Sequence, residues 1–154
     1  MSALPVSALK DAIKADMKAA MRAGDKDRLG VIRMLLAAIQ RREVDERIEL
    51  DDAGVLQAIE KLVKQGQESA RQYTDGGRQE LADKELAEIE TLRQYLPEQL
   101  SDADLDALID RIIAETGAES VRDMGKVMGA IREHAQGRAD MGVVGGRVKA
   151  KLSG

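Results

Sequence analysis

Apolar residues recur at intervals of three and four along most of this chain, which is the spacing of one face of an α-helix. Ahead of Pro97 the pattern predicts four helices, over residues 7–24, 25–47, 51–76 and 79–95. After Pro97 it predicts three shorter helices, over residues 101–117, 120–137 and 140–152. Only short connections separate the seven stretches. The chain is therefore predicted to be all-α.

Residues that begin and end helices stand at the expected boundaries. Ser101 and Ser120 are each followed three residues later by an aspartate, which is the spacing of a capping box. Pro97 cannot continue a helix, because it lacks an N–H group and its ring collides with the preceding turn. We therefore expect an N-terminal four-helix bundle over residues 1–96, joined to a C-terminal three-helix domain over residues 97–154.

The amino-acid composition supports the helical prediction and restricts the core. Ala, Leu, Glu, Lys, Arg, Gln and Met dominate the chain, and these are strong helix formers. Tyr73 and Tyr95 are the only aromatic residues, so the core must be built from Leu, Ile, Val, Met and Ala. Cysteine is absent, which excludes disulfides, thiolate metal sites and cysteine nucleophiles.

The sequence carries no signal for a membrane or for secretion. No apolar run approaches the roughly 20 residues needed to span a bilayer. The opening residues lack a basic segment followed by an apolar core, which a signal peptide would have. The sequence thus predicts a cytoplasmic protein that makes no membrane contact.

Charge is distributed unevenly over the last third of the chain. Residues 97–121 hold seven acids and one base, whereas residues 122–154 hold seven bases and three acids. Such polarity favours a binding surface over a catalytic one. The candidate RNA-binding residues, expected to gather on one surface and contact phosphates, are Lys126, Arg132, Arg138, Arg147, Lys149 and Lys151. The alternative is a solvated basic face, in which Arg138 bonds Asp140 or a carbonyl.

Two glycines in the predicted helix 120–137 need an explanation. Gly125 and Gly129 lie one turn apart, and each glycine inside a helix costs about 1 kcal/mol relative to alanine. A missing Cβ lets another helix pack closely, which is the commoner reason for such a pair. It also lets an RNA backbone or a partner protein approach the helix. Both explanations stay open at this point.

No arrangement of side chains predicts catalysis, a cofactor or a bound metal. His134 is the only histidine, and a metal site needs several ligands at set spacing. The carboxylates lie on helix faces mixed with Lys and Arg, and no pair stands out for acid–base work. The two tyrosines lie outside the basic region, so any RNA contact is expected to be with backbone and shape rather than with stacked bases.

Six short motifs occur in a fixed order along the chain. They are DKDRL at 25–29, VIRML at 31–35, YLPEQL at 95–100, GKVMG at 125–129, GRAD at 137–140 and the closing helix at 148–152. Through them the chain resembles the GatB/YqeY family over about residues 7–153. Its C-terminal part is similar to the tail domain of the B subunit of the glutamine-dependent tRNA amidotransferase. Gly66 departs from the pattern, since a bulkier and often basic residue is expected there.

The resemblance implies a function connected with tRNA. The amidotransferase is a carbon–nitrogen ligase that amidates Glu or Asp already attached to tRNA, with glutamine as the amido-N donor. That reaction needs a glutaminase site and an ATP-using kinase site, and this sequence contains the residues of neither. We therefore expect a non-catalytic accessory that binds tRNA, together with a partner protein in tRNA aminoacylation or amidation.

Two other classes of function stay open. The protein could be a protein–protein adaptor that docks a partner helix on the face of Gly125 and Gly129. It could instead be a small enzyme whose carboxylates the sequence does not distinguish from solvated ones. Phosphate binding weakens steeply with added salt, whereas apolar docking does not, so salt dependence separates RNA binding from the adaptor.

Overall fold

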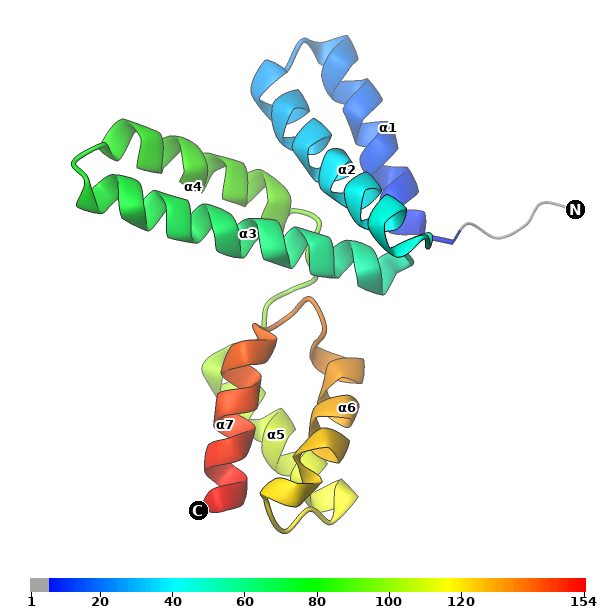
Figure 1. Ribbon diagram of the computed structural model, residues 1–154, viewed down its shortest axis with the longest axis vertical. Coiled ribbons are helices and arrows are strands. Elements are labelled where there is room, and N and C mark those ends of the chain that lie inside the picture. Colours follow the sequence, from blue (N-terminus) through cyan, green and yellow to red (C-terminus); the bar gives the residue numbers. More distant parts are fainter. Residues whose placement is uncertain (1–5) are drawn as a thin grey trace, which may run out of the picture. The chain divides into compact units, whose positions relative to one another are not determined.

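The computed structural model describes residues 6–154, and every regular element in that range is helical (Figure 1). The helices are α1 (Ala8–Ala23), α2 (Lys26–Glu46), α3 (Asp52–Asp75), α4 (Gln79–Arg93), α5 (Asp102–Thr116), α6 (Met124–Ala135) and α7 (Met141–Ser153). A 3₁₀ turn, η1 (Val121–Asp123), leads into α6. The all-α prediction is confirmed. Residues 1–5, on which the prediction about a signal peptide partly rests, lie outside the described residues.

The chain divides into two compact units, one ending at Leu96 and the other beginning at Pro97. The first unit contains α1–α4 and the second contains α5–α7. Each unit has a hydrophobic core of its own, made of different residues. Each is therefore described by itself.

Capping side chains explain where the helices begin. The side chains of Ser7, Asp25 and Ser101 each accept a hydrogen bond from the backbone N–H three residues later. Asp140 caps α7 in the same way, through the N–H groups of Gly142 and Val143. A cap of this kind contributes about 1 kcal/mol to a helix. These four predicted helix starts are confirmed.

Two adjacent aspartates stand at the start of α3, and they have different roles. Asp51 caps the helix, because its carboxylate accepts from the N–H of Gly54 at 2.9 Å. Asp52 instead accepts from the hydroxyl of Ser7 at 2.6 Å and from the N–H of Leu9 at 3.1 Å. These two donors, Ser7 first, lower the pKa of Asp52. Asp52 thus ties the beginning of α1 to the beginning of α3.

The first unit consists of two helical hairpins, α1 with α2 and α3 with α4. Figure 1 shows that the hairpins diverge, with their turns pointing away from one another. Where they meet, they enclose a core that contains no Phe or Trp and whose buried members are aliphatic. Its largest buried side chains are Ile13, Ile32, Leu35, Ile39, Leu50, Val55, Ile59 and Leu92.

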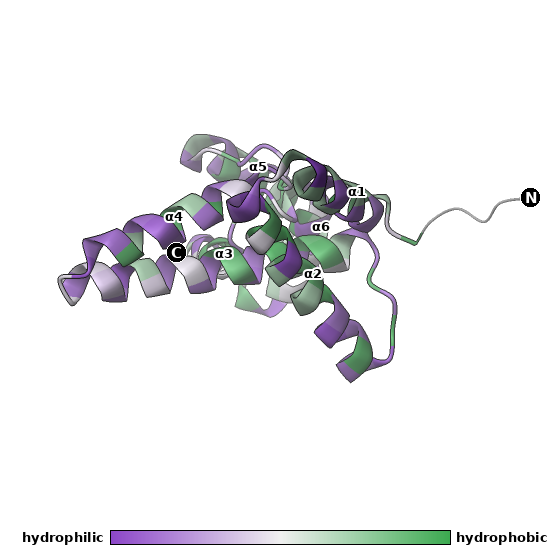
Figure 2. Cartoon of the chain, turned by 90° about the horizontal axis from the view of Figure 1, so that it is seen from above, coloured by the Kyte–Doolittle hydropathy of each residue, from purple (hydrophilic) through white to green (hydrophobic). Residues whose placement is uncertain are grey.

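One leucine at helical spacing on α4 does not face the core. Ile89 and Leu92 are buried as expected, whereas Leu86 is 46% exposed. Ala82 takes the inward place instead. Figure 2 shows hydrophilic and hydrophobic stretches along α3 and α4, as expected of amphipathic helices.

Gly66 lies on the side of α3 that packs against α4. A Cβ atom at this position would lie 3.0 Å from Cγ1 and 3.1 Å from Cδ1 of Ile89. Ile89 is 2% exposed, so its side chain has little room to move away. This contact explains why glycine stands where the resemblance leads us to expect a bulkier residue.

The Gly66→Leu substitution is therefore expected to lower the free energy of unfolding by about 1–3 kcal/mol, since it overpacks a buried contact. Gly30→Leu is the matched control, because a Cβ at Gly30 would have no described atom within 4 Å. We expect the control to keep or slightly raise stability, as leucine is the better helix former. Chemical denaturation followed by circular dichroism measures both. Equal stability of the two variants would contradict this account of Gly66.

Tyr95 connects the end of α4 to the first hairpin. Its hydroxyl donates to Oδ2 of Asp16 at 2.6 Å. Arg28 lies 3.8 Å from the same carboxylate and donates to Oε1 of Gln94 at 2.8 Å. Burial, and then the bond to Asp16, raise the pKa of Tyr95 to about 12. The cluster thus joins α1, α2 and the end of the first unit.

The raised pKa of Tyr95 predicts a loss of stability in alkaline solution. The fold favours the protonated phenol, so its contribution is complete below about pH 10 and is lost as the pH rises towards about 12. Tyr95→Phe should lose less stability across this interval than the unmodified protein. Denaturant midpoints between pH 9 and pH 12 test this, and identical pH profiles of the two proteins would refute it.

The second unit is a three-helix arrangement in which α6 runs antiparallel to both α5 and α7 (Figure 1). Val144, Val148 and Leu152 of α7 face its core, as their spacing of four predicted. The remaining buried members of this core are Leu105, Ile109, Ile112, Val127, Met128, Ile131 and Ala135. The polar side chains of this unit carry the candidate site.

Candidate nucleic-acid interface

The six predicted RNA-binding cations lie on three parts of the second unit. Lys126 and Arg132 belong to α6, and Arg138 lies in the connection between α6 and α7. The other three, Arg147, Lys149 and Lys151, belong to α7. Their surroundings differ from one part to the next.

Two of the cations on α7 are engaged by carboxylates of α5. Arg147 bonds Asp102 at 2.8 Å and Asp106 at 3.1 Å, and Lys151 bonds Asp110 at 2.8 Å. The hydrogen bond to Asp110 is the main reason why the pKa of Lys151 is raised. We call this set the α5–α7 ion pairs. Exposed ion pairs of this kind each contribute little to stability, but they occupy these two cations.

The α5–α7 ion pairs follow from spacing in both helices. Asp102, Asp106 and Asp110 are four residues apart and so share one face of α5. Arg147 and Lys151 are also four residues apart and share one face of α7. The opposite charges of residues 97–121 and 122–154 therefore partly neutralise each other inside the unit. The acidic repeat is visible in the sequence, but its partner helix is not.

Arg138 lies in the connection between α6 and α7 and joins it to the segment ahead of α5. Its Nε donates to the carbonyl of Glu98 at 2.9 Å. Two further hydrogen bonds join the same segments. The side chain of Gln99 donates to the carbonyl of Gly137 at 2.7 Å, and the N–H of Leu100 donates to the carbonyl of Arg138 at 2.8 Å. Two of the motifs that carry the family resemblance, YLPEQL and GRAD, thus meet in space. The alternative in which Arg138 bonds a carbonyl is what the structure contains.

The outward side of α6 is different, because it is open. Gly125, Lys126, Gly129 and Arg132 are all exposed, and Arg122 is exposed just ahead of them in η1. We call these five residues the α6 outer face. The opposite side of the helix is buried in the core through Val127, Met128, Ile131 and Ala135.

Neither glycine of the α6 outer face is needed for packing within the described chain. A Cβ atom at Gly125 or at Gly129 would have no described atom within 4 Å. Close approach of another helix of the second unit is therefore not the reason for either glycine. The second explanation, approach by a ligand or partner, stays open.

Three of the six cations make no ion pair or side-chain hydrogen bond in the part of the chain that the structure describes. They are Lys126, Arg132 and Lys149. Lys149 is exposed and lies one turn after Gly145, which approaches the methyl groups of Met124 and Met128 on α6. Lys149 thus lies on the side of α7 that faces α6. Glu133 is the one carboxylate among the exposed residues 124–135.

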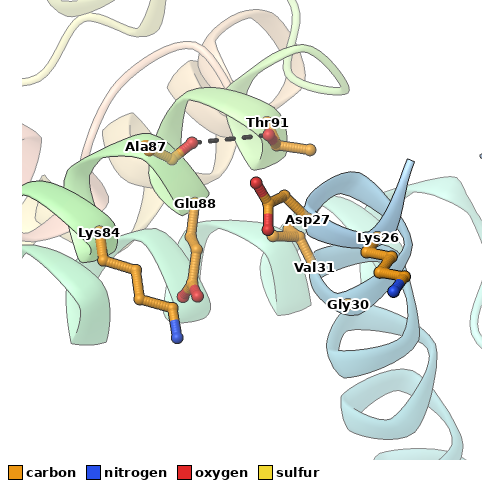
Figure 3. A pocket seen from close by; sticks show the side chains of 8 residues that line it. All are labelled: Lys26, Asp27, Gly30, Val31, Lys84, Ala87, Glu88 and Thr91. Carbon is orange, nitrogen blue, oxygen red and sulfur yellow. Dashed lines mark hydrogen bonds between the residues drawn. The ribbon is translucent and has the colours of Figure 1, made fainter. Parts of the chain in front are cut away.

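A cleft of about 570 Å³ lies in the first unit, between the start of α2 and α4 (Figure 3). On one side of the cleft, α4 contributes Lys84 and Glu88. On the other side, α2 contributes Lys26 and Asp27 of the DKDRL motif. Burial, with a smaller effect from Glu85, raises the pKa of Glu88. The lining offers charges of both signs but no pairing of a nucleophile with a base.

Residues 6–154 contain neither a cluster of metal ligands nor a membrane-spanning helix. No group of three or more His, Cys, Asp or Glu side chains is placed to hold a metal ion there. None of the helices in that range is long and apolar enough to cross a bilayer. His134 is exposed on α6, and its carbonyl accepts from Arg138 at 3.4 Å.

These features define an all-helical protein with an open, cationic helix face on its second unit. The family described as Yqey-like protein matches residues 10–152 of the chain. The chain therefore belongs to the YqeY-like family, and the resemblance stated from its motifs is confirmed at the level of the family.

Three of the curated relatives come from fungi. The chain is 32% identical over 106 residues to "Altered inheritance of mitochondria protein 41, mitochondrial" of Lachancea thermotolerans, a match that covers 67% of this chain and 57% of the relative. It is 28% identical over 137 residues to the protein of the same name from Pyrenophora tritici-repentis, covering 88% and 75% of the two chains. An uncharacterized protein of Schizosaccharomyces pombe is 30% identical over 93 residues, covering 60% and 76%.

The relatives correct one prediction. The names of those from Lachancea, Pyrenophora and Eremothecium all contain the word mitochondrial. The prediction of a cytoplasmic protein is contradicted by this finding. The sequence argument rested only on missing membrane and secretion signals, and those do not distinguish the cytosol from an organelle.

The open environment of Gly129 predicts that alanine is tolerated there. Gly129→Ala should raise the free energy of unfolding by up to about 1 kcal/mol, since alanine is the better helix former and meets no neighbour. Gly137→Ala, in the same unit, should lower stability because Gly137 has φ +78°. Thermal unfolding compares the two, and a destabilised Gly129→Ala would restore the packing explanation.

Proposed function

We propose that this protein is a non-catalytic tRNA-binding protein that acts as an accessory of a tRNA amidotransferase. In this proposal the three helices after Pro97 form a tail-like domain joined to a four-helix bundle. Any carbon–nitrogen ligase activity, with glutamine as the amido-N donor, would belong to a larger complex. This chain would supply the positioning of tRNA. The observation that supports the proposal best is the α6 outer face.

The α6 outer face has the properties that a phosphate backbone requires. Gly125 and Gly129 leave the helix backbone uncovered, so a bulky strand can approach it closely. Lys126 and Arg132 flank the glycines, and neither is neutralised by an ion pair within residues 6–154. Cations of this kind bind phosphates by releasing counterions. The face contains no aromatic side chain, which suits contacts to backbone and shape.

The six predicted RNA-binding cations differ in how much they would contribute. Lys126, Arg132 and Lys149 are the primary contacts, because they need not leave a partner first. Arg147 and Lys151 would have to exchange Asp102, Asp106 and Asp110 for phosphate. Arg138 would have to keep its bond to Glu98 while it reaches the RNA.

A protein–protein adaptor is the second candidate. The same open face of Gly125 and Gly129 would accept a partner helix, which needs small residues for close approach. This interaction would depend on the shape of the face and little on its charge. The two candidates therefore differ in their response to salt.

The leading proposal predicts a definite salt dependence. Replacing Lys126, Arg132 and Lys149 together with Gln should weaken tRNA binding several-fold. It should also reduce the slope of log affinity against log salt by roughly 2 to 3, since each phosphate contact contributes roughly 0.7 to 0.9. Filter binding at several salt concentrations measures both quantities, and circular dichroism checks that helicity is unchanged.

A matched control removes the same charge elsewhere. Arg71, Arg78 and Arg93 of the α3–α4 hairpin are ion-paired to local glutamates, so their replacement with Gln should leave the slope almost unchanged. An equal slope for the test variant and the unmodified protein would remove the proposed interface. Binding of a protein partner that resists salt but is lost in Gly129→Leu would instead favour the adaptor.

A further inference from the structure

The outward side of α1 carries a row of cations that the fold does not use. Lys14, Lys18 and Arg22 are four residues apart, so they share one face, and all three are exposed. We call them the α1 basic stripe. Four residues advance about 6 Å along a helix, so the stripe presents three positive charges in a regular line.

No member of the α1 basic stripe has a carboxylate of its own among the described residues: the pKa of Glu43 is lowered first by its hydrogen bond from Lys10, and the charge of Lys14 is the last of the causes. Lys10, one turn earlier, is held by Glu43 at 2.8 Å, but no ion pair or side-chain hydrogen bond reaches the three members of the stripe. Of the other carboxylates near α1, Asp16 is taken by Tyr95 and Arg28. Asp11 lies in the first turn, ahead of the stripe.

Four other helices each contain an arginine that is paired locally, whereas Lys126, Arg132 and Lys149 of the second unit resemble the stripe in making no ion pair among the described residues. One arginine on each of α2, α3, α4 and α5 forms an ion pair with a glutamate three or four residues away on the same helix. Like charges at a spacing of four destabilise a helix by a few tenths of a kcal/mol per pair. Repulsion within the stripe therefore lowers the stability of α1 slightly. An anionic partner would offset this repulsion by attracting all three cations.

We propose that the α1 basic stripe is a second contact for the phosphate backbone of RNA. This inference rests on the proposed function, because it adds a contact on the first unit to the α6 outer face on the second. Two contacts on one chain make the second binding event intramolecular, which raises the overall affinity without a stronger individual site.

The side chains between the cations favour RNA over an anionic bilayer. Ala15, Ala19 and Ala23 are exposed beside the stripe and offer little apolar surface for insertion into lipid. Met21, 52% exposed, is the one large apolar side chain exposed on α1. Small neighbours leave room for a sugar–phosphate backbone to approach the three cations.

The test replaces Lys14, Lys18 and Arg22 together with Gln in the full chain and measures tRNA binding against salt. We expect a several-fold weaker affinity and a slope reduced by roughly 2 to 3, with unchanged thermal unfolding. The Arg71, Arg78 and Arg93 variant is the control of equal charge, and it should bind as the unmodified protein does.

The outcomes separate the two proposals. If the unmodified chain binds tRNA and the stripe variant binds equally well, the second contact is refuted while the proposed function stands. If the unmodified chain binds no tRNA, the proposed function fails, and the second contact fails with it. Vesicles containing phosphatidylserine are the remaining probe: binding to them that the stripe variant loses, with tRNA binding unaffected, would overturn the RNA contact in favour of a membrane surface.

Discussion

The pairing of three carboxylates on α5 with two cations on α7 decides which charges of the second unit remain available. Arg147 and Lys151 are held at 2.8–3.1 Å by Asp102, Asp106 and Asp110. The unit therefore does not present one uniform basic surface, even though residues 122–154 are strongly basic. What remains open is the α6 outer face, together with Lys149 on α7. The functional account depends on this division between cations that hold the unit together and cations that face outward.

A second constraint is the nearly complete absence of aromatic side chains. Aliphatic cores fill their space through close contact between helices, and Gly66 against Ile89 is the clearest case. The glycines of α6 are of the opposite kind, since no described atom lies near the position of their missing Cβ. The same residue type thus has a structural role in the first unit, whereas in the second unit it leaves a surface uncovered. Only the environment distinguishes the two.

Local signals predicted the helices well, because capping and helix termination involve residues a few positions apart. Ser7, Asp25, Ser101 and Asp140 cap the helices that their positions predicted. Ion pairing between helices and the burial of individual side chains depend on which helices become neighbours, so local signals did not predict them. The acidic repeat of α5 is visible in the sequence, but its match to α7 is not, so all six cations seemed equally available. The exposed Leu86 on α4 is a similar case, since its spacing suits a buried face and yet it is 46% exposed.

The central claim is that RNA contacts the protein through the α6 outer face and not through the cations that α5 already holds. Amide chemical shifts of the full chain during titration with tRNA at low salt test this most directly, because glycine amides are well resolved. The account predicts that Gly125, Gly129 and their neighbours on α6 shift first and most, while Asp102 to Asp110 of α5 stay in place. Shifts confined to α5 and the C-terminal half of α7, with α6 unchanged, would contradict it.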